Sequence, residues 1–481
     1  MNDAIFILAG VKRYRNSTSV TQEGDAFRLR ILFLCIYDSL MYDAHENEDK
    51  ITPLAITNWR DIRKKIGIKE KNRRGHIYVI GKTGTGKSSL LGNMAISDIE
   101  GGNGIALIDP HGDLAESLLK HIPNDRLKDV TYFKPGDLEY PIAFNPLEKI
   151  HPDFHHLVVS GLISVFRKIW SEFWGPRLEH ILRHALYTLL EYPESTLLDV
   201  PRLLTEKEFR FKVINSITNP HIKAFWQNEF EKYSAWLKTE AVAPILNKMG
   251  QFLTSLPLRN VIGQPANRFR ISEAMDEGKI LIVNLAKGKL GEDNSSLLGS
   301  MLVTEIYLSA LRRARIPEAE RRAFYLYVDE FYTFITLSFA DILSEARKYG
   351  LNLVLAHQYI NQLHEKVSDA IFGNVGTIIS FRIGSDDAEF LAKEFKPTFS
   401  ERDLVNLPNY NIYLKLMVNG ITSLPFSATT LPFPVDQISN PEEITENSRI
   451  RYCGKRNVVE REILLKYYQD TNLNKKQETL F

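Results

Sequence analysis

The stretch of this chain best suited to chemistry is the glycine-rich segment Gly81–Ser88, which reads Gly-Lys-Thr-Gly-Thr-Gly-Lys-Ser. This pattern is typical of a phosphate-binding loop, in which glycines let the backbone turn tightly and point its N–H groups at phosphate oxygens. Lys87 can bring a positive charge to the β- and γ-phosphates, and the Ser88 hydroxyl can ligate Mg²⁺. We therefore predict a nucleotide-binding site here. Its expected residues are Gly81, Lys82, Thr83, Gly84, Thr85, Gly86, Lys87, Ser88 and Ser89.

The residues on both sides of the loop agree with this interpretation. Ile77–Ile80 is a short apolar run that predicts a strand, and Ser88–Ile96 has the apolar spacing of a helix. A phosphate loop needs this order, because the start of the following helix adds N–H donors for an anion. The alternative is a glycine turn with no ligand between a strand and a helix.

A pair of carboxylates, Asp329 and Glu330, follows the apolar run Phe324–Val328, which predicts another strand. In phosphoryl transfer to water, Asp329 can hold Mg²⁺ opposite Ser88, and Glu330 can orient or deprotonate the attacking water. An Asp-Glu pair is common in proteins, and the alternative is a solvated strand end. The phosphate loop elsewhere in the chain favours the catalytic interpretation.

Three more polar side chains can complete such a site. Gln358 follows the strand predicted over Leu351–Ala356, and its amide can contact a γ-phosphate and the water; the alternative is an amide bound to loop backbone. Arg382 and Arg347 can bring positive charge to a γ-phosphate in the same subunit or an adjacent one. An ordinary ion pair is the alternative for both arginines, and we favour it for Arg347.

The residues Asp109, His111 and Asp113 follow the strand predicted over Ile105–Ile108. Their types suit a metal site. We prefer a turn that packs against the nucleotide site, in which Asp113 caps the helix predicted over Leu114–Leu119.

Strands alternate with helices along most of the chain. Further strands are predicted over Val130–Phe133, Ile280–Val283 and Thr377–Phe381, and further helices over Ser295–Arg313, Leu337–Tyr349 and Ser368–Phe372. This order predicts an α/β fold with a mostly parallel sheet covered on both faces, whose ligand site lies at the carboxyl ends of the strands. The segments Asn411–Val418 and Ile421–Phe426 predict a hairpin at the far edge of the sheet.

Other segments differ from this core in composition. Between Pro152 and Arg259, apolar residues recur every three or four positions, which predicts an inserted all-α lobe. Residues 51–75 carry eight basic residues against two acidic ones, and we interpret them as a solvated linker in preference to a nucleic-acid contact. Beyond Pro432 the chain turns polar, with a short helix predicted over Arg461–Tyr468 and a disordered end after it.

Composition sets the broad class of the protein. The 481 residues are 44% hydrophobic and 25% charged, as in ordinary globular proteins, and the net charge of +1 gives no general attraction to nucleic acid. The two cysteines lie far apart and have no metal-ligand spacing. The apolar run 31–37 is far shorter than the roughly 20 residues of a membrane span. We therefore expect a cytoplasmic protein with no integral membrane segment.

Five blocks of sequence, in this order, resemble the HerA/FtsK superfamily of DNA-pumping ATPases, in particular conjugative coupling proteins and type IV secretion ATPases of the TraG/VirD kind. The blocks are Gly81–Ser88, Ile108–Leu114, Val328–Phe331, Ser344–Leu351 with Ala356–Gln358, and Asn374–Thr377 with Phe381–Arg382. By motif order, the resemblance covers roughly residues 55–435.

Five residues of this sequence match the motifs of that superfamily. Lys87 and Ser88 match the Walker A pair, and Asp329 and Glu330 match the Walker B pair. Gln358 matches the sensor glutamine. The resemblance thus implies that these residues bind and hydrolyse ATP with Mg²⁺.

The resemblance also implies a RecA-like core and a homo-hexameric ring that binds ATP between subunits and threads DNA through a central pore. A neighbouring subunit would give an arginine finger, for which Arg382 is our first choice and Arg347 our second. Coupling proteins usually carry N-terminal transmembrane helices, and this sequence shows none, so docking on a membrane channel does not follow from the resemblance.

The expected domains are an N-terminal extension (1–54), a first part of the ATPase core (55–150), the all-α insertion (151–260), a second part of the core (261–435) and a polar C-terminal tail (436–481). We expect a motor that moves along DNA, with a protein partner such as a nuclease or relaxase. The alternatives are a secretion-type ATPase that acts on protein substrates and a nucleotide-gated scaffold that hydrolyses little ATP.

Overall fold

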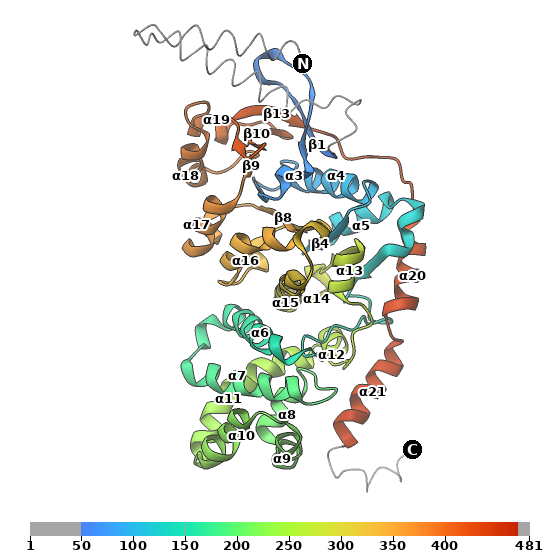
Figure 1. Ribbon diagram of the computed structural model, residues 1–481, viewed down its shortest axis with the longest axis vertical. Helices are drawn as coiled ribbons and strands as arrows, with labels where there is room; N and C mark the ends of the chain where they lie inside the picture. The colour runs from blue at the N-terminus through green and yellow to red at the C-terminus, as the bar shows by residue number, and fades with distance from the viewer. Residues whose placement is uncertain (1–49, 149, 470–481) are drawn as a thin grey trace.

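The computed structural model describes residues 50–148 and 150–469, which form a sheet-based core and a helical lobe attached to it (Figure 1). Most of the predicted N-terminal extension (1–54) and the end of the predicted tail, residues 470–481, lie outside the described residues.

An eleven-stranded sheet forms the centre of the core. In spatial order its strands are β2 (Lys65–Lys69), β1 (Ile51–Thr57), β13 (Phe426–Thr430), β10 (Asn411–Lys415), β9 (Thr377–Ser380), β3 (Ile77–Ile80), β8 (Leu351–His357), β7 (Phe324–Val328), β4 (Gly104–Asp109), β6 (Ile280–Asn284) and β5 (Val130–Phe133). Each pairing from β9 to β5 is parallel, and each pairing from β2 to β9 is antiparallel. The predicted mostly parallel α/β sheet is confirmed.

Helices cover both faces of this sheet and divide its apolar side chains into two clusters. One cluster includes α4 (Lys87–Glu100) and α5 (Asp113–Leu118); the other includes α15 (Glu292–Arg312), α16 (Phe339–Glu345) and α17 (Glu365–Asn374). Successive strand residues contribute to opposite clusters, as Val79 and Ile80 do in β3. Strands buried on both faces are continuous apolar runs, which is why the sequence reveals them. The remaining core helices are α13 (Ile271–Glu277), α14 (Lys287–Leu290), α18 (Ser385–Phe395) and α19 (Glu401–Val405).

The antiparallel edge of the sheet corrects two predictions. Residues 51–75 are not a linker, because they form β1, β2 and α3 (Glu70–Arg73). The predicted hairpin is not at the edge: β10 pairs with β9 and with β13, and β13 pairs in turn with β1, where Ala55 lies opposite Thr430. Composition could not reveal this pairing, since it joins segments from opposite ends of the core. The tip of the hairpin forms a separate ribbon of β11 (Met417–Val418) and β12 (Ile421–Thr422).

The inserted helical lobe is confirmed and lies on the side of the core that carries α15 (Figure 1). Its helices are α6 (His155–Ile169), α7 (Pro176–Glu191), α8 (Asp199–Thr205), α9 (Lys207–Ser216), α10 (Pro220–Ala224), α11 (Ala235–Thr254) and α12 (Leu256–Ile262). Helix α6 packs along α15 and joins the lobe to the core. In the described part of the chain, no helix combines the length and the apolar character needed to cross a bilayer.

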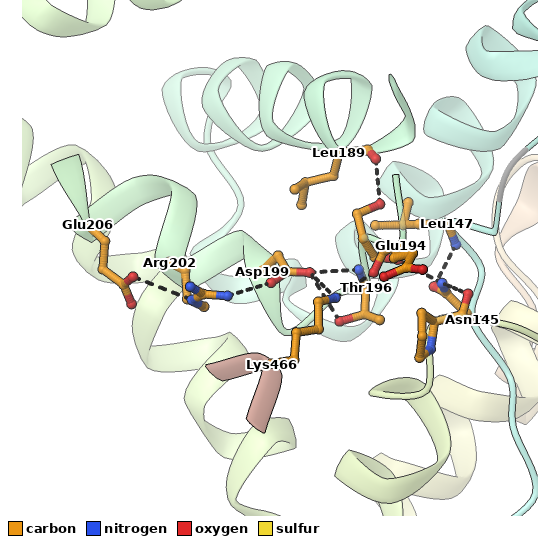
Figure 2. Close-up of polar contacts among 11 residues, drawn as sticks. Asn145, Leu147, Leu189, Glu194, Thr196, Asp199, Arg202, Glu206 and Lys466 are labelled. Carbon is orange, nitrogen blue, oxygen red and sulfur yellow. Dashed lines mark hydrogen bonds and ion pairs between the residues drawn. The ribbon is translucent and has the colours of Figure 1, made fainter. Parts of the chain in front are cut away.

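Two C-terminal helices run from the core to the lobe (Figure 1). α20 (Pro441–Tyr452) lies beside β5, where Ser448 Oγ accepts the N–H of Tyr132 at 2.9 Å. α21 (Arg456–Gln469) reaches the lobe, where Lys466 Nζ donates to the buried carboxylate of Asp199 at 2.9 Å (Figure 2). The segment expected to be a polar tail is therefore helical through much of its length.

One arginine of the basic segment 51–75 belongs to the core. Arg73 is 1% exposed, and its guanidinium donates to both carboxylate oxygens of Asp98, at 2.5 and 2.9 Å, and to the Tyr327 hydroxyl at 2.8 Å. Burial alone would lower the pKa of Arg73, but the charge of Asp98 raises it. This ion pair joins α3 and α4 to β7 beneath the sheet, so Arg73 is not available to a nucleic acid.

Arg73→Ala should lower the free energy of unfolding by about 3–5 kcal/mol, because the buried Asp98 side chain would lose its cationic partner and keep only the Tyr327 hydroxyl. The exposed neighbour Arg74, 4.0 Å from Glu318, provides the control. Arg74→Ala should change the same quantity by less than about 0.5 kcal/mol. Chemical denaturation measures both variants, and equal effects would contradict the assignment.

Candidate nucleotide-binding site

The predicted phosphate loop lies between the end of β3 and the start of α4, at the carboxyl edge of the parallel strands. Gly84 and Gly86 have φ angles of +75° and +117°, which side chains other than glycine rarely allow. A Cβ atom at Gly81 would lie 2.5 Å from the Phe381 side chain, and one at Gly86 would lie 2.9 Å from the Tyr410 ring. The glycines are therefore required by backbone conformation and by close packing.

Hydrogen bonds attach the loop to the ends of neighbouring strands. The N–H of Gly81 donates to the carbonyl of His357 at 3.3 Å, and the N–H of Lys82 donates to the carbonyl of Arg382 at 2.8 Å. Lys87 Nζ donates to the carbonyls of Gly81 and Lys82 at 2.7 and 3.3 Å. The lysine ammonium thus lies within the loop, whose tip at Gly84 is exposed.

The structure brings together the two residues predicted to hold a metal ion. Ser88 Oγ donates to Asp329 Oδ2 at 3.0 Å across the gap between α4 and the end of β7. Asp329 is 5% exposed; burial, with the nearby carboxylates of Glu330 and Asp109, raises its pKa to about 6. Mg²⁺ prefers oxygen ligands and is held by one or two carboxylates. A serine hydroxyl and a desolvated carboxylate therefore fit this ion.

Glu330 and Gln358 also lie together at this edge. Glu330 is 5% exposed and has a left-handed φ of +46°, a conformation that a non-glycine residue adopts at some energetic cost. Gln358 Nε2 donates to Glu330 Oε1 at 2.7 Å. The other oxygen, Oε2, is buried with no hydrogen-bond partner among the described residues. An unpaired buried carboxylate oxygen suits a group that orients or deprotonates a water.

The two candidate arginines lie at opposite edges of the sheet. Arg382 follows β9 beside the phosphate loop, where its guanidinium donates to Asn409 Oδ1 at 2.9 Å and to the carbonyl of Leu407 at 3.4 Å. Arg347 lies in the turn before β8, at the amino edge, and is exposed. Its guanidinium has no hydrogen bond or ion pair within the described ranges. Only Arg382 therefore lies near the loop of its own chain.

The cluster Asp109, His111 and Asp113 forms a turn, in agreement with the preferred interpretation. One detail was wrong: Asp109, and not Asp113, holds the start of α5, by accepting the N–H groups of His111 and Ala115 at 2.8 and 3.0 Å. Asp113 is the exposed first residue of the helix. Among the described residues, no cluster of three or more His, Cys, Asp and Glu side chains suits a metal ion.

Sequence reasoning missed Tyr410, which precedes β10. Its N–H donates to the carbonyl of Thr85 at 2.8 Å, and its ring lies against Gly86. The side chain is 52% exposed, and φ is +65°. No local pattern marks this residue, because its position at the loop depends on β10 lying two strands from β3.

Comparison with known proteins agrees with this geometry. The family model described as the type IV secretion-system coupling protein DNA-binding domain matches residues 62–411. The chain belongs to this family. It carries a P-loop ATPase core, and the resemblance to coupling proteins is confirmed.

Solved structures of the plasmid coupling protein TrwB have a similar fold. TrwB with a non-hydrolysable ATP analogue has a TM-score of 0.58 and 16% identity, over 80% of this chain and 91% of that one. TrwB with ADP and Mg²⁺ has a TM-score of 0.55 and 17% identity, over 79% and 90%. No curated protein sequence matches the chain.

Asp329→Asn should stabilise the nucleotide-free protein by about 1–3 kcal/mol at pH 7 and abolish Mg²⁺-dependent ATP hydrolysis. The pKa of Asp329 is raised from 3.8 to about 6, so ionisation destabilises the folded state, and this penalty grows as pH rises through that range. The extra stability of Asp329→Asn over the wild-type protein should therefore shrink as the pH is lowered towards about 4.

Urea unfolding across this pH range measures the stability of both proteins. Asp113→Asn, at an exposed carboxylate, is the control and should have no effect beyond about 0.5 kcal/mol. A loss of stability in Asp329→Asn at neutral pH would contradict the proposed desolvation.

Proposed function

We propose that this protein is a motor that hydrolyses ATP with Mg²⁺ and uses the energy to translocate DNA. One observation carries the proposal: the phosphate loop, the Ser88–Asp329 pair and the Glu330–Gln358 pair meet at one edge of a parallel sheet. Phosphoryl transfer to water needs a phosphate cradle, a metal ion and a group that orients the water, and these residues can supply them.

Each residue has a definable role. The loop N–H groups and Lys87 bind the phosphates, and Ser88 and Asp329 hold Mg²⁺, which neutralises phosphate charge when bound. The free oxygen of Glu330 orients a water and takes its proton, while Gln358 holds the carboxylate through its other oxygen.

The assignment of DNA as substrate is supported by the family, whose description names a DNA-binding domain. A protein-secreting ATPase and a weakly hydrolysing scaffold are the alternatives to be separated by experiment. A nuclease or relaxase as partner and a cytoplasmic location stay predictions.

The purified protein should hydrolyse ATP faster when DNA is added, and this stimulation should fall steeply with salt, because contacts to phosphates depend on ionic strength. Glu330→Gln should still bind ATP and should lower kcat by about 10²-fold or more. Glu365→Gln, at an exposed position in α17, is the matched control. Stimulation by a protein partner alone would overturn the DNA assignment, and unchanged turnover in Glu330→Gln would favour the scaffold.

We further propose that the active site is completed in a homo-hexameric ring, where Arg347 of one subunit approaches the nucleotide of the next. Arg347 is exposed and lies at the sheet edge opposite the loop, and a head-to-tail contact between subunits would bring these two edges together. Arg382 is held by Leu407 and Asn409 of its own chain, which favours a role in the same subunit. The order of preference drawn from the sequence is therefore reversed.

Arg347→Ala and Lys87→Ala should each lose ATPase activity, and mixing the two variants should restore part of it. Mixed rings contain interfaces that combine an intact Lys87 with an intact Arg347 from the neighbour. The pair Arg382→Ala and Lys87→Ala should recover nothing, because both groups then serve one subunit. Steady-state hydrolysis after mixing and dilution measures this, and recovery in the second mixture alone would assign the finger to Arg382.

A further inference from the structure

Lys168 lies in the last turn of α6 in the helical lobe, and its ammonium reaches the core. Nζ donates to the carbonyl of Thr333 and, at 3.4 Å, to that of Tyr332. No carboxylate lies within ion-pair distance of Lys168 among the described residues, and burial lowers its pKa to about 7. A half-buried ammonium that meets only carbonyls is costly, which singles this contact out from ordinary surface lysines.

The carbonyls that Lys168 binds belong to the turn that follows Glu330. The N–H of Thr333 donates to the carbonyl of Glu330 at 3.0 Å. Lys168 therefore binds a residue that is itself hydrogen-bonded to the backbone of Glu330, the proposed catalytic residue. The carbonyl of Thr333 also accepts Ser296 Oγ of α15 at 2.8 Å. One carbonyl is therefore held by a helix of the lobe and by a helix of the core.

A second contact from α6 supports the same segment. Ser164, one turn before Lys168, lies with its hydroxyl 3.2 Å from that of Ser338, which is in turn 2.8 Å from Thr336 Oγ1. One face of α6 thus contacts both ends of residues 333–338.

Packing leaves this segment little freedom on its core side. Phe334 is 1% exposed, and a Cβ atom at Gly299 of α15 would lie 2.2 Å from its ring. Since Glu330 keeps a left-handed backbone, its neighbours must hold it in that conformation. Asp329 Oδ1 accepts the N–H of Glu330 at 3.0 Å, Gln358 holds its side chain, and the following turn holds its carbonyl.

We propose that Lys168 is a positioning residue through which the helical lobe controls the geometry of Glu330. A substrate that displaces the lobe would move α6 and alter the hydrogen bonds from Lys168 to the turn after Glu330. The position of Glu330, and with it the rate of hydrolysis, would change as a result. This inference rests on the proposed ATPase function and adds a route by which substrate contact reaches the active site.

Lys168→Met keeps an unbranched side chain that is one atom shorter and removes its donors. In the full-length protein it should lower kcat for ATP by about tenfold and leave KM within about twofold, because the phosphate loop is untouched. Lys168→Arg, which keeps the positive charge, should recover most of the rate. The control is Lys238→Met, on α11 of the same lobe, where the lysine pairs with Glu231 at 3.3 Å.

Hydrogen exchange provides a readout that does not require turnover. In Lys168→Met, exchange should rise in residues 331–338 and stay unchanged in α4. Unchanged exchange there, or an equal rise through the whole core, would overturn the inference. Wild-type protein without ATPase activity would refute the proposed function, while the exchange result would still decide the role of Lys168. Should Lys168→Met fail to fold, Ser164→Ala tests the same segment, and unchanged exchange in it would overturn the inference.

Discussion

Two adjacent carboxylates, buried at the end of β7, are the constraint on which the rest of the site depends. Asp329 and Glu330 are each 5% exposed, and the charge of Glu330 contributes to the raised pKa of Asp329. Lys87, Ser88 and Gln358 surround them with donors or positive charge. Burying like charges side by side costs stability, and a protein keeps such an arrangement where a cation and a water are to be bound.

The order of the strands makes this arrangement possible. β3 and β7 are separated only by β8, so the loop after β3 faces the carboxylates after β7, with Gln358 after β8 between them. Parallel strands that end at one edge gather residues that are far apart in the chain, here Ser88 and Asp329. The helical lobe is inserted in the chain between β5 and β6, and its helix α6 packs along α15 and reaches the turn after Glu330.

Local patterns predicted much of the fold and of the site. The apolar run of β7 and the glycines of the phosphate loop can be read directly from the sequence, since burial on both faces and left-handed backbone each restrict residue type. Pairings between distant segments could not be predicted, which explains why β1 was interpreted as a linker and why Tyr410 was missed. The sequence predicted that Asp113 caps α5, whereas Asp109 does so. Which of the two carboxylates reaches the N–H groups depends on the shape of the turn between them, and the sequence does not show that shape.

The antiparallel pairing of β1 with β13 has a consequence for synthesis on the ribosome. The carbonyls that anchor the phosphate loop, and Tyr410 beside it, all come from segments translated long after the loop itself. A nascent chain that ends before β8 would hold the loop without these supports, and one that ends before β13 would leave β1 without this partner strand. The phosphate loop would thus gain its full set of contacts only after Tyr410 has been translated.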